Sequence, residues 1–176
     1  MELHGFYILK DEFFELANDP YLKNNKEGNR PFYYCIKDLT FTKEVYWMIP
    51  LSGRVSKNQQ IIDEKESEHK PCDGLYICHL PNGKKSVFLI QDIFPITSEY
   101  VDREFTLGGN HLVLPYQDDI DIIDKKAKKV SPSSLMVVQN TTIMILWAVN
   151  IRTMKAEDRN RKWWNASEDE RRLCAS

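Results

Sequence analysis

Short runs of aromatic and β-branched residues, separated by turn residues, constrain the fold of this chain more than any other feature. These runs fall at residues 5–9, 31–37, 44–51, 75–80 and 86–91. Their length and composition are typical of β-strands. Because they do not alternate regularly with helices, a doubly wound parallel sheet is disfavoured. The sequence predicts an α+β fold in which a strongly bent antiparallel sheet or small barrel carries peripheral helices.

Local signals predict how several of these runs are connected. Asn82-Gly83 separates two apolar runs and predicts a β-hairpin. Apolar residues recur at helical spacing over 119–130, where acids come first and lysines last, so this segment is predicted to be a helix. Asp11 is a predicted cap for a helix over 12–17. We also expect a short helix over 97–103 and a last strand over 111–114. The polar segment 55–68 is expected to be helical or irregular.

The length of 176 residues, of which 42% are hydrophobic, suits one compact domain with a sizeable core. We predict that residues 1–130 form this domain. Ser131-Pro132 interrupts the last helix, and residues 131–176 form a divergent segment whose packing the sequence does not predict. The first ten residues lack the pattern of a secretory signal, and no segment is long and apolar enough to span a membrane. We therefore expect a cytoplasmic protein.

The net charge of −2 counts against nucleic-acid binding, but positive charge is locally concentrated. Cations gather at Arg54 and Lys57, at Lys84 and Lys85, and along residues 125–129.

The chain has four cysteines, and their spacing does not match a zinc site. They are Cys35, Cys72, Cys78 and Cys174. We expect reduced thiols in a reducing cytosol, and we predict neither a metal nor a cofactor.

The turn after the predicted strand 44–51 brings a hydroxyl, a guanidinium and an ammonium within six residues: Ser52, Arg54 and Lys57. Metal-free cleavage of RNA uses the 2′-hydroxyl as the nucleophile and places extra negative charge on phosphorus-bound oxygens. Preorganised donors must stabilise that charge. Arg54 offers a forked donor and Lys57 a point charge. On spacing alone, a solvated loop with ordinary basic residues is the favoured interpretation.

A resemblance to a known family changes that balance. The chain resembles the endoribonuclease toxins of type III toxin–antitoxin systems, the family of ToxN and AbiQ, and is most similar to its CptN and TenpN branch. Five segments carry the resemblance, in matching order: Gly-Phe-Tyr-Ile-Leu at 5–9, Asn-Arg-Pro-Phe-Tyr-Tyr at 29–34, Ile-Pro-Leu-Ser at 49–52, Ser-Val-Phe-Leu-Ile-Gln-Asp-Ile-Phe-Pro-Ile at 86–96, and the Lys-Lys-Ala-Lys-Lys run within 123–129.

The resemblance implies a Kid- or MazF-like fold. It implies metal-independent cleavage of RNA that leaves a 2′,3′-cyclic phosphate and a 5′-hydroxyl. It also implies a partner, an RNA antitoxin of pseudoknot repeats that the toxin processes and then binds in a closed protein–RNA assembly. Such systems defend bacteria against phage by abortive infection, or maintain plasmids.

The resemblance also assigns residues. The family's catalytic turn is Pro-Leu, then Ser or Thr, then Ser, then a basic residue. Ser52 matches the first hydroxyl, Gly53 replaces the second, and Arg54 takes the basic position, with Lys57 just downstream. Tyr34 is a further catalytic candidate, with ordinary strand packing as its alternative. The cations expected to bind RNA phosphates are Lys84, Lys85, Lys125, Lys126, Lys128 and Lys129. For residues 125–129 a solvated helix end is the alternative.

Two other functions stay open on the sequence alone. An RNA-binding module without catalysis agrees with the missing hydroxyl at Gly53. A protein–protein adaptor with an acidic surface agrees only with the net charge.

Overall fold

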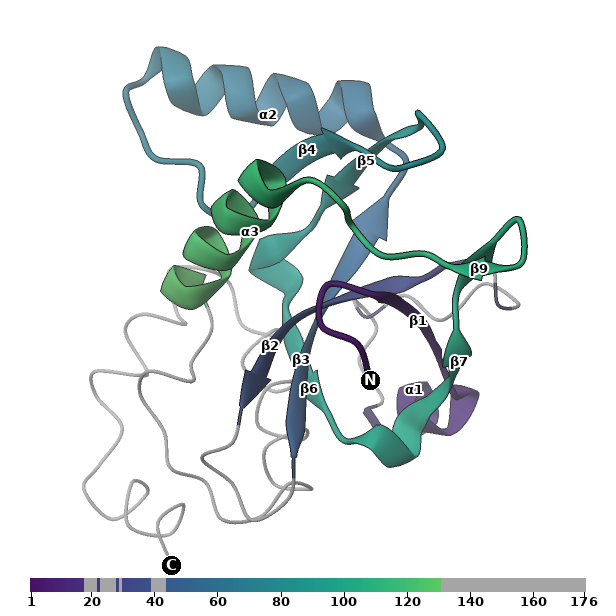
Figure 1. Ribbon diagram of the computed structural model, residues 1–176. Helices are drawn as coiled ribbons and strands as arrows, with labels where there is room; N and C mark the ends of the chain where they lie inside the picture. The colour runs from purple at the N-terminus through teal and green to yellow at the C-terminus, as the bar shows by residue number, and fades with distance from the viewer. Residues whose placement is uncertain (18–21, 23–27, 29, 39–43, 131–176) are drawn as a thin grey trace, which may run out of the picture.

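A computed structural model describes residues 1–17, 22, 28, 30–38 and 44–130 of the chain (Figure 1). The predicted C-terminal segment, residues 131–176, lies outside the described residues. In the described part, every pairing between strands is antiparallel and three α-helices flank the sheet, which confirms the predicted α+β class.

The main sheet has seven strands in the order β4-β5-β3-β2-β1-β7, with β6 paired to β3 beside this path. The strands are β1 (Phe6–Leu9), β2 (Phe32–Asp38), β3 (Val45–Ser52), β4 (Tyr76–His79), β5 (Lys85–Phe88), β6 (Phe94–Ile96) and β7 (Val101–Glu104). β4 and β7 form the two ends of the path, and the sheet does not close between them. The expectation of a small barrel is therefore wrong for the described residues.

β3 organises the sheet because it is its longest strand and pairs along both edges. β2 runs along one edge, while β6 and then β5 occupy the other. The register between β2 and β3 shifts between Tyr34 and Ile36, and that between β1 and β7 shifts between Ile8 and Leu9. Such bulges bend strands and increase their twist. The last residue of β3, Ser52, pairs with Val87 of β5.

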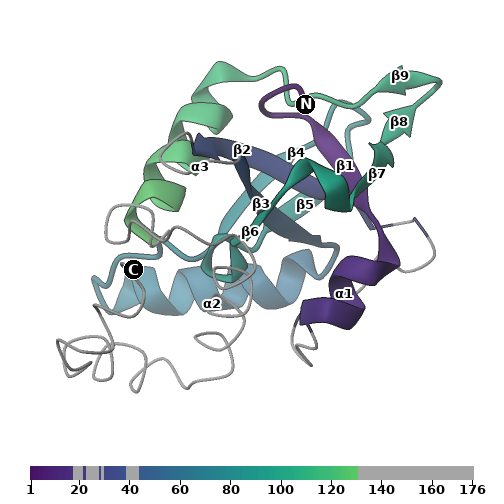
Figure 2. The same cartoon turned by 90° about the horizontal axis from the view of Figure 1, so that it is seen from below.

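Alternate residues of the strands build two apolar cores, because successive side chains of a strand point to opposite faces. One core contains Phe6, Tyr33, Trp47 and Phe88, together with the apolar stripe of α3. The other contains mainly aromatic residues: Tyr7, Phe13, Phe32, Tyr34, Tyr46 and Phe94. In Figure 2, α3 lies beside β2, while α1 lies next to β1 on another side of the sheet.

The helices are α1 (Asp11–Ala17), α2 (Val55–Ser67) and α3 (Gln117–Val130). α3 buries Ile120, Ile123 and Ala127, the stripe that the spacing predicts. α2 differs, because it is polar and buries no residue. Among the described residues, no helix combines the length and apolar character needed to cross a membrane.

The prediction for residues 97–103 is wrong. A single 3₁₀ turn, η2 (Ser98–Tyr100), leads directly into β7, which pairs with β1. A second 3₁₀ turn, η1 (Ile90–Asp92), connects β5 and β6. The expected strand over 111–114 is only partly present. A small hairpin of β8 (Thr106–Leu107) and β9 (Asn110–His111) precedes an isolated bridge between Gly5 and Val113.

Candidate functional site

The turn between β3 and α2 holds the predicted hydroxyl in a defined position. Ser52 is half-buried at the end of β3, and its Oγ accepts a hydrogen bond of 3.2 Å from the backbone N–H of Arg54. Because Oγ accepts this bond, its own hydrogen is left to donate to another group. The turn is secured from the other side by Asn58, whose Nδ2 donates to the Arg54 carbonyl oxygen over 2.7 Å.

The N-terminus of α2 carries no capping side chain. Arg54 is its cap residue, with φ −83° and ψ 60°, and its side chain makes no capping hydrogen bond. The first backbone N–H groups of a helix have no partner within the helix and lie at the positive end of its dipole. Arg54 and Lys57 are exposed at this end, so local charge and backbone donors there all favour an anion.

The β4–β5 hairpin confirms the prediction from Asn82-Gly83. The N–H of Leu80 donates to the carbonyl of Lys84, and the N–H of Gly83 donates to that of Leu80. Gly83 adopts a φ of +75°, a region that disfavours other residues. The tip carries Lys84 and Lys85, both exposed.

Sheet pairing brings the hairpin tip to the same end of the molecule as the turn. Ser52 pairs with Val87, two residues from Lys85 on the same strand. α2 packs against β5, the second strand of the hairpin. We name this surface the cationic corner and define it as Ser52, Arg54, Lys57, Lys84 and Lys85. Within the described residues, none of its four cations forms a salt bridge.

The cationic corner is also free of acidic residues. No Asp or Glu occurs from residue 45 to 62 or from 74 to 91, although the whole chain has 26 acids. The two segments that the sheet brings together therefore combine four cations with no opposing charge. This gap in the distribution of acids was visible in the sequence, and it marks the surface better than the separate basic residues do.

Tyr34, the fourth catalytic candidate, lies away from the cationic corner. It pairs with Met48 in the middle of β3 and is only 1% exposed. Its ring contacts those of Tyr7 and Tyr46 in the aromatic core, and burial raises the pKa of its hydroxyl. The structure thus agrees with the alternative of strand packing for Tyr34.

Two of the four α3 lysines predicted to bind RNA are engaged with protein groups. The Nζ of Lys126 donates to the carbonyl oxygens of Cys72 and, over 3.1 Å, of Leu75. Lys129 forms a salt bridge of 3.1 Å with Asp73. These contacts hold the segment before β4 against α3, so the two side chains are structural. Lys125 and Lys128 are exposed.

We expect Lys126→Met to lower the free energy of unfolding by about 1–3 kcal/mol, because two carbonyls lose a charged donor. Lys125→Met, an exposed change on the same helix, should stay within about 0.5 kcal/mol of the unaltered protein. Equilibrium unfolding in urea measures both. A larger loss for Lys125→Met than for Lys126→Met would contradict the structural role of Lys126.

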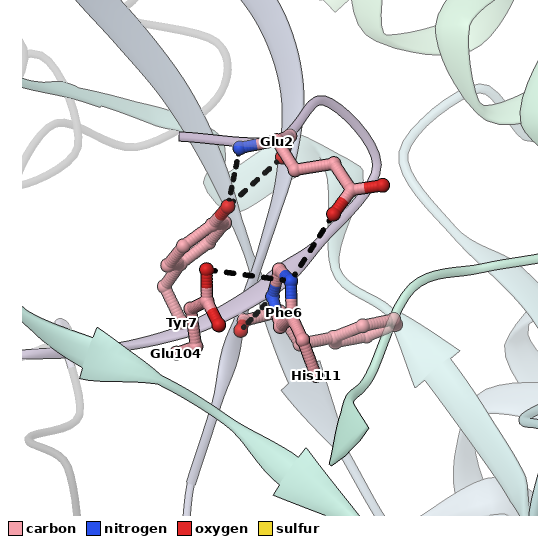
Figure 3. Close-up of polar contacts among 5 residues, drawn as sticks. All are labelled: Glu2, Phe6, Tyr7, Glu104 and His111. Carbon is pink, nitrogen blue, oxygen red and sulfur yellow. Dashed lines mark hydrogen bonds and ion pairs between the residues drawn. The ribbon is translucent and has the colours of Figure 1, made fainter.

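A polar cluster around His111 ties the N-terminal residues to the sheet (Figure 3). The Nε2 of His111 lies 3.1 Å from the carbonyl oxygen of Phe6, and its Nδ1 lies 3.4 Å from Glu2 and 3.7 Å from Glu104. The Tyr7 hydroxyl accepts the N–H of Glu2 and donates to its carbonyl. These contacts join residues near the N-terminus to β1, β7 and β9.

A second cluster lies between the N-terminal residues, β2 and α3. The Nδ1 of His4 lies 2.8 Å from the Tyr33 hydroxyl, and the His4 backbone adopts a positive φ of 65°. Burial lowers the pKa of His4 and raises that of Asp124, while the attraction between the two groups opposes both shifts. This cluster lies under α3, away from the cationic corner, and sequence reasoning gave no sign of it.

Gly53 is open to substitution. A Cβ at this position meets no atom within 4 Å, and its φ does not lie in the left-handed region. We therefore expect Gly53→Ser, which restores the second hydroxyl of the resembled turn, to leave the free energy of unfolding unchanged or to raise it by up to about 1 kcal/mol. Thermal unfolding tests this, and a less stable variant would contradict it.

Comparison with known proteins assigns no family to the chain. No protein-family model matches it, and no curated protein sequence matches it.

Proposed function

We propose that this chain is the toxin of a type III toxin–antitoxin system, a metal-independent endoribonuclease that an RNA antitoxin inhibits. The observation that carries the proposal is the cationic corner. There, two paired segments that lack acids carry a hydroxyl with a hydrogen left to donate and four cations that form no salt bridge in the described part of the chain. This combination suits a phosphodiester backbone.

The proposed reaction begins with attack of an RNA 2′-hydroxyl on the adjacent phosphorus atom. Ser52 Oγ donates a hydrogen bond to a non-bridging oxygen. Arg54 binds two phosphate oxygens through its fork, and Lys57 adds a third positive group. Charge on these oxygens grows in the transition state, and donors that are already positioned stabilise it without reorganisation. The products are a 2′,3′-cyclic phosphate and a 5′-hydroxyl.

Lys84 and Lys85 bind the RNA backbone next to the scissile phosphate in this proposal, and Lys125 and Lys128 offer additional contacts on α3. Lys126 and Lys129 are not included, because carbonyl groups and Asp73 engage them. The same surface would hold the pseudoknot repeats of the antitoxin in a closed protein–RNA assembly. The likeness to the Kid and MazF folds and the cytoplasmic location are part of the proposal too. So are phage defence and plasmid maintenance.

Purified full-length protein and total bacterial RNA test the proposal. We expect cleavage at discrete sites with 2′,3′-cyclic phosphate ends, detected by mapping of RNA termini. Ser52→Ala should abolish most of this cleavage, whereas Ser56→Ala, an exposed serine of α2, should not.

Absence of RNA cleavage by the unaltered protein, with RNA binding retained, would overturn the nuclease and favour an RNA-binding module. Equal cleavage by the unaltered protein and Ser52→Ala would remove Ser52 from the reaction.

A further inference from the structure

The cationic corner lacks an evident group that exchanges protons. RNA cleavage requires removal of the proton from the attacking 2′-hydroxyl, and imidazole or carboxylate groups are the usual acceptors. The two segments of the corner contain no carboxylate, and Tyr34 is buried. The only imidazole in these two segments is that of His79, at the end of β4.

Sheet register places His79 on the same face as Ser52. Ser52 pairs with Val87, and Val87 pairs with Ile77 on β4. Two residues further along, Lys85 pairs with His79. Directly paired residues share a face, and so do residues two apart on one strand. Ser52, Lys85 and His79 therefore project from one face, with Lys85 on the strand between the other two.

The spacing of these residues suits a phosphodiester group. Strands lie about 4.8 Å apart and rise by about 3.4 Å per residue, so the backbones of Ser52 and His79 are separated by about 12 Å. Side chains of a strand stand roughly perpendicular to the sheet, so the Ser52 hydroxyl and the imidazole border the space above Lys85. A phosphate in that space, held by a hydrogen bond of about 2.8 Å from Ser52, would have the imidazole on its other side.

The residues on this face change from buried to exposed toward the hairpin tip, where the proposed site lies. Val87 is fully buried and Ile77 is half-buried, in the region where α2 packs on β5. Lys85 and His79 are both exposed. Cover by α2 thus ends before the hairpin tip, so that a nucleic-acid strand can reach the imidazole from solvent.

The other three histidines are differently placed. The rings of His4 and His111 interact with the Tyr33 hydroxyl and the Phe6 carbonyl. His69 follows the C-terminal end of α2, opposite to the end that carries Arg54. Among the described residues, the ring of His79 takes part in no hydrogen bond or salt bridge, and it is the histidine nearest in register to Ser52.

We propose that His79 is the general base of the cationic corner, an inference that rests on the proposed nuclease function. Neutral imidazole takes the proton of the 2′-hydroxyl as the bond from O2′ to phosphorus forms. The bond from phosphorus to O5′ then breaks, its electron pair stays on O5′, and O5′ takes a proton from water. The imidazolium returns its proton to solvent, so the reaction is balanced. Lys85, between Ser52 and His79, neutralises charge on the phosphate.

The experiment compares the full-length protein with His79→Gln, which keeps a polar side chain, and with the matched control His69→Gln. The substrate is a short labelled RNA that spans one cleavage site mapped in total bacterial RNA. Single-turnover rates are measured across a range of pH. Affinity is measured separately with the same RNA carrying a 2′-deoxy nucleotide at the scissile position, which cannot react.

We expect His79→Gln to lower the cleavage rate by about 10²–10⁴-fold, the usual contribution of a general acid or base. The rise of the rate with pH should disappear in this variant, and its affinity for the 2′-deoxy RNA should change by less than threefold. His69→Gln should behave like the unaltered protein. A 5′-thio leaving group, which departs without protonation, should not restore the rate of His79→Gln.

The outcomes separate this inference from the proposed function. If the unaltered protein cleaves RNA and His79→Gln cleaves equally fast, His79 is not the base although the nuclease stands. If the 5′-thio substrate restores the rate, His79 is a general acid and the assignment as base is overturned. If the unaltered protein cleaves no RNA, the proposed function itself fails, and the assignment of His79 fails with it.

Discussion

Replacement of Arg54 by alanine is expected to lower the rate of RNA cleavage by about 10²–10³-fold, the effect of removing one preorganised donor to a developing oxyanion. Arg54 is exposed at the N-terminus of α2, next to the Ser52 hydroxyl, and no salt bridge among the described residues competes for its guanidinium. Because, in the part of the chain that the structure describes, the hydrogen bonds of Arg54 in this turn come from its backbone, truncation of the side chain should leave the turn intact. Single-turnover cleavage under saturating protein measures the chemical step.

Two further variants distinguish the geometry of the guanidinium from its charge and from the overall charge of the protein. Arg54→Lys keeps the charge but loses the forked geometry, so its rate should lie between those of the unaltered protein and Arg54→Ala. Arg103→Ala removes an exposed arginine from β7, at the end of the sheet opposite to β4, and should cleave normally. A loss for Arg103→Ala as large as that for Arg54→Ala would mean that overall charge, and not the cationic corner, determines the rate.

The parts of the fold that the sequence predicts are those that local signals determine. The hairpin at Asn82-Gly83 and helix α3 follow from turn chemistry and helical spacing, and the structure confirms both. The prediction at residues 97–103 is wrong because a non-local contact determines the structure there. Thr97 and Ser98 suit a helix start, but β7 forms because β1 offers it a partner more than ninety residues away in sequence. Tertiary pairing of this kind overrides local propensity.

The candidate site likewise has one part that local sequence specifies and another that only strand pairing specifies. Ser52, Arg54 and Lys57 are neighbours in sequence, so local signals alone place them on the turn after β3 and at the start of α2. That Lys85 and His79 lie on the same face as Ser52 depends on the pairing of β5 with both β3 and β4, which no local pattern specifies. The hydrogen bonds of Lys126 could not be predicted from the sequence either, because its carbonyl partners at Cys72 and Leu75 come from a loop about fifty residues earlier.

Phe88→Ala is expected to lower the free energy of unfolding by about 3–5 kcal/mol, the usual cost of deleting a buried aromatic ring. Phe88 is 0% exposed, and its ring lies 5.1 Å from that of Tyr33 and 6.3 Å from that of Phe6, edge-on in both pairs. It also pairs with Leu51, the residue before Ser52. Equilibrium unfolding in urea measures the loss, which is a large share of the roughly 5–15 kcal/mol typical of a folded domain.

The cost of Phe88→Ala should come from the cavity, and a volume-conserving change tests that cause. Phe88→Leu fills most of the space and should cost less than about 1.5 kcal/mol. Tyr116→Ala removes a ring from a residue that is 48% exposed and should cost less than about 0.5 kcal/mol. If Phe88→Leu were as damaging as Phe88→Ala, the aromatic edge contacts and not the filled volume would hold β5 against β3. If all three variants were equally stable, Phe88 would lie outside the core, and the register that brings Lys85 and His79 onto the face of Ser52 would lose its support.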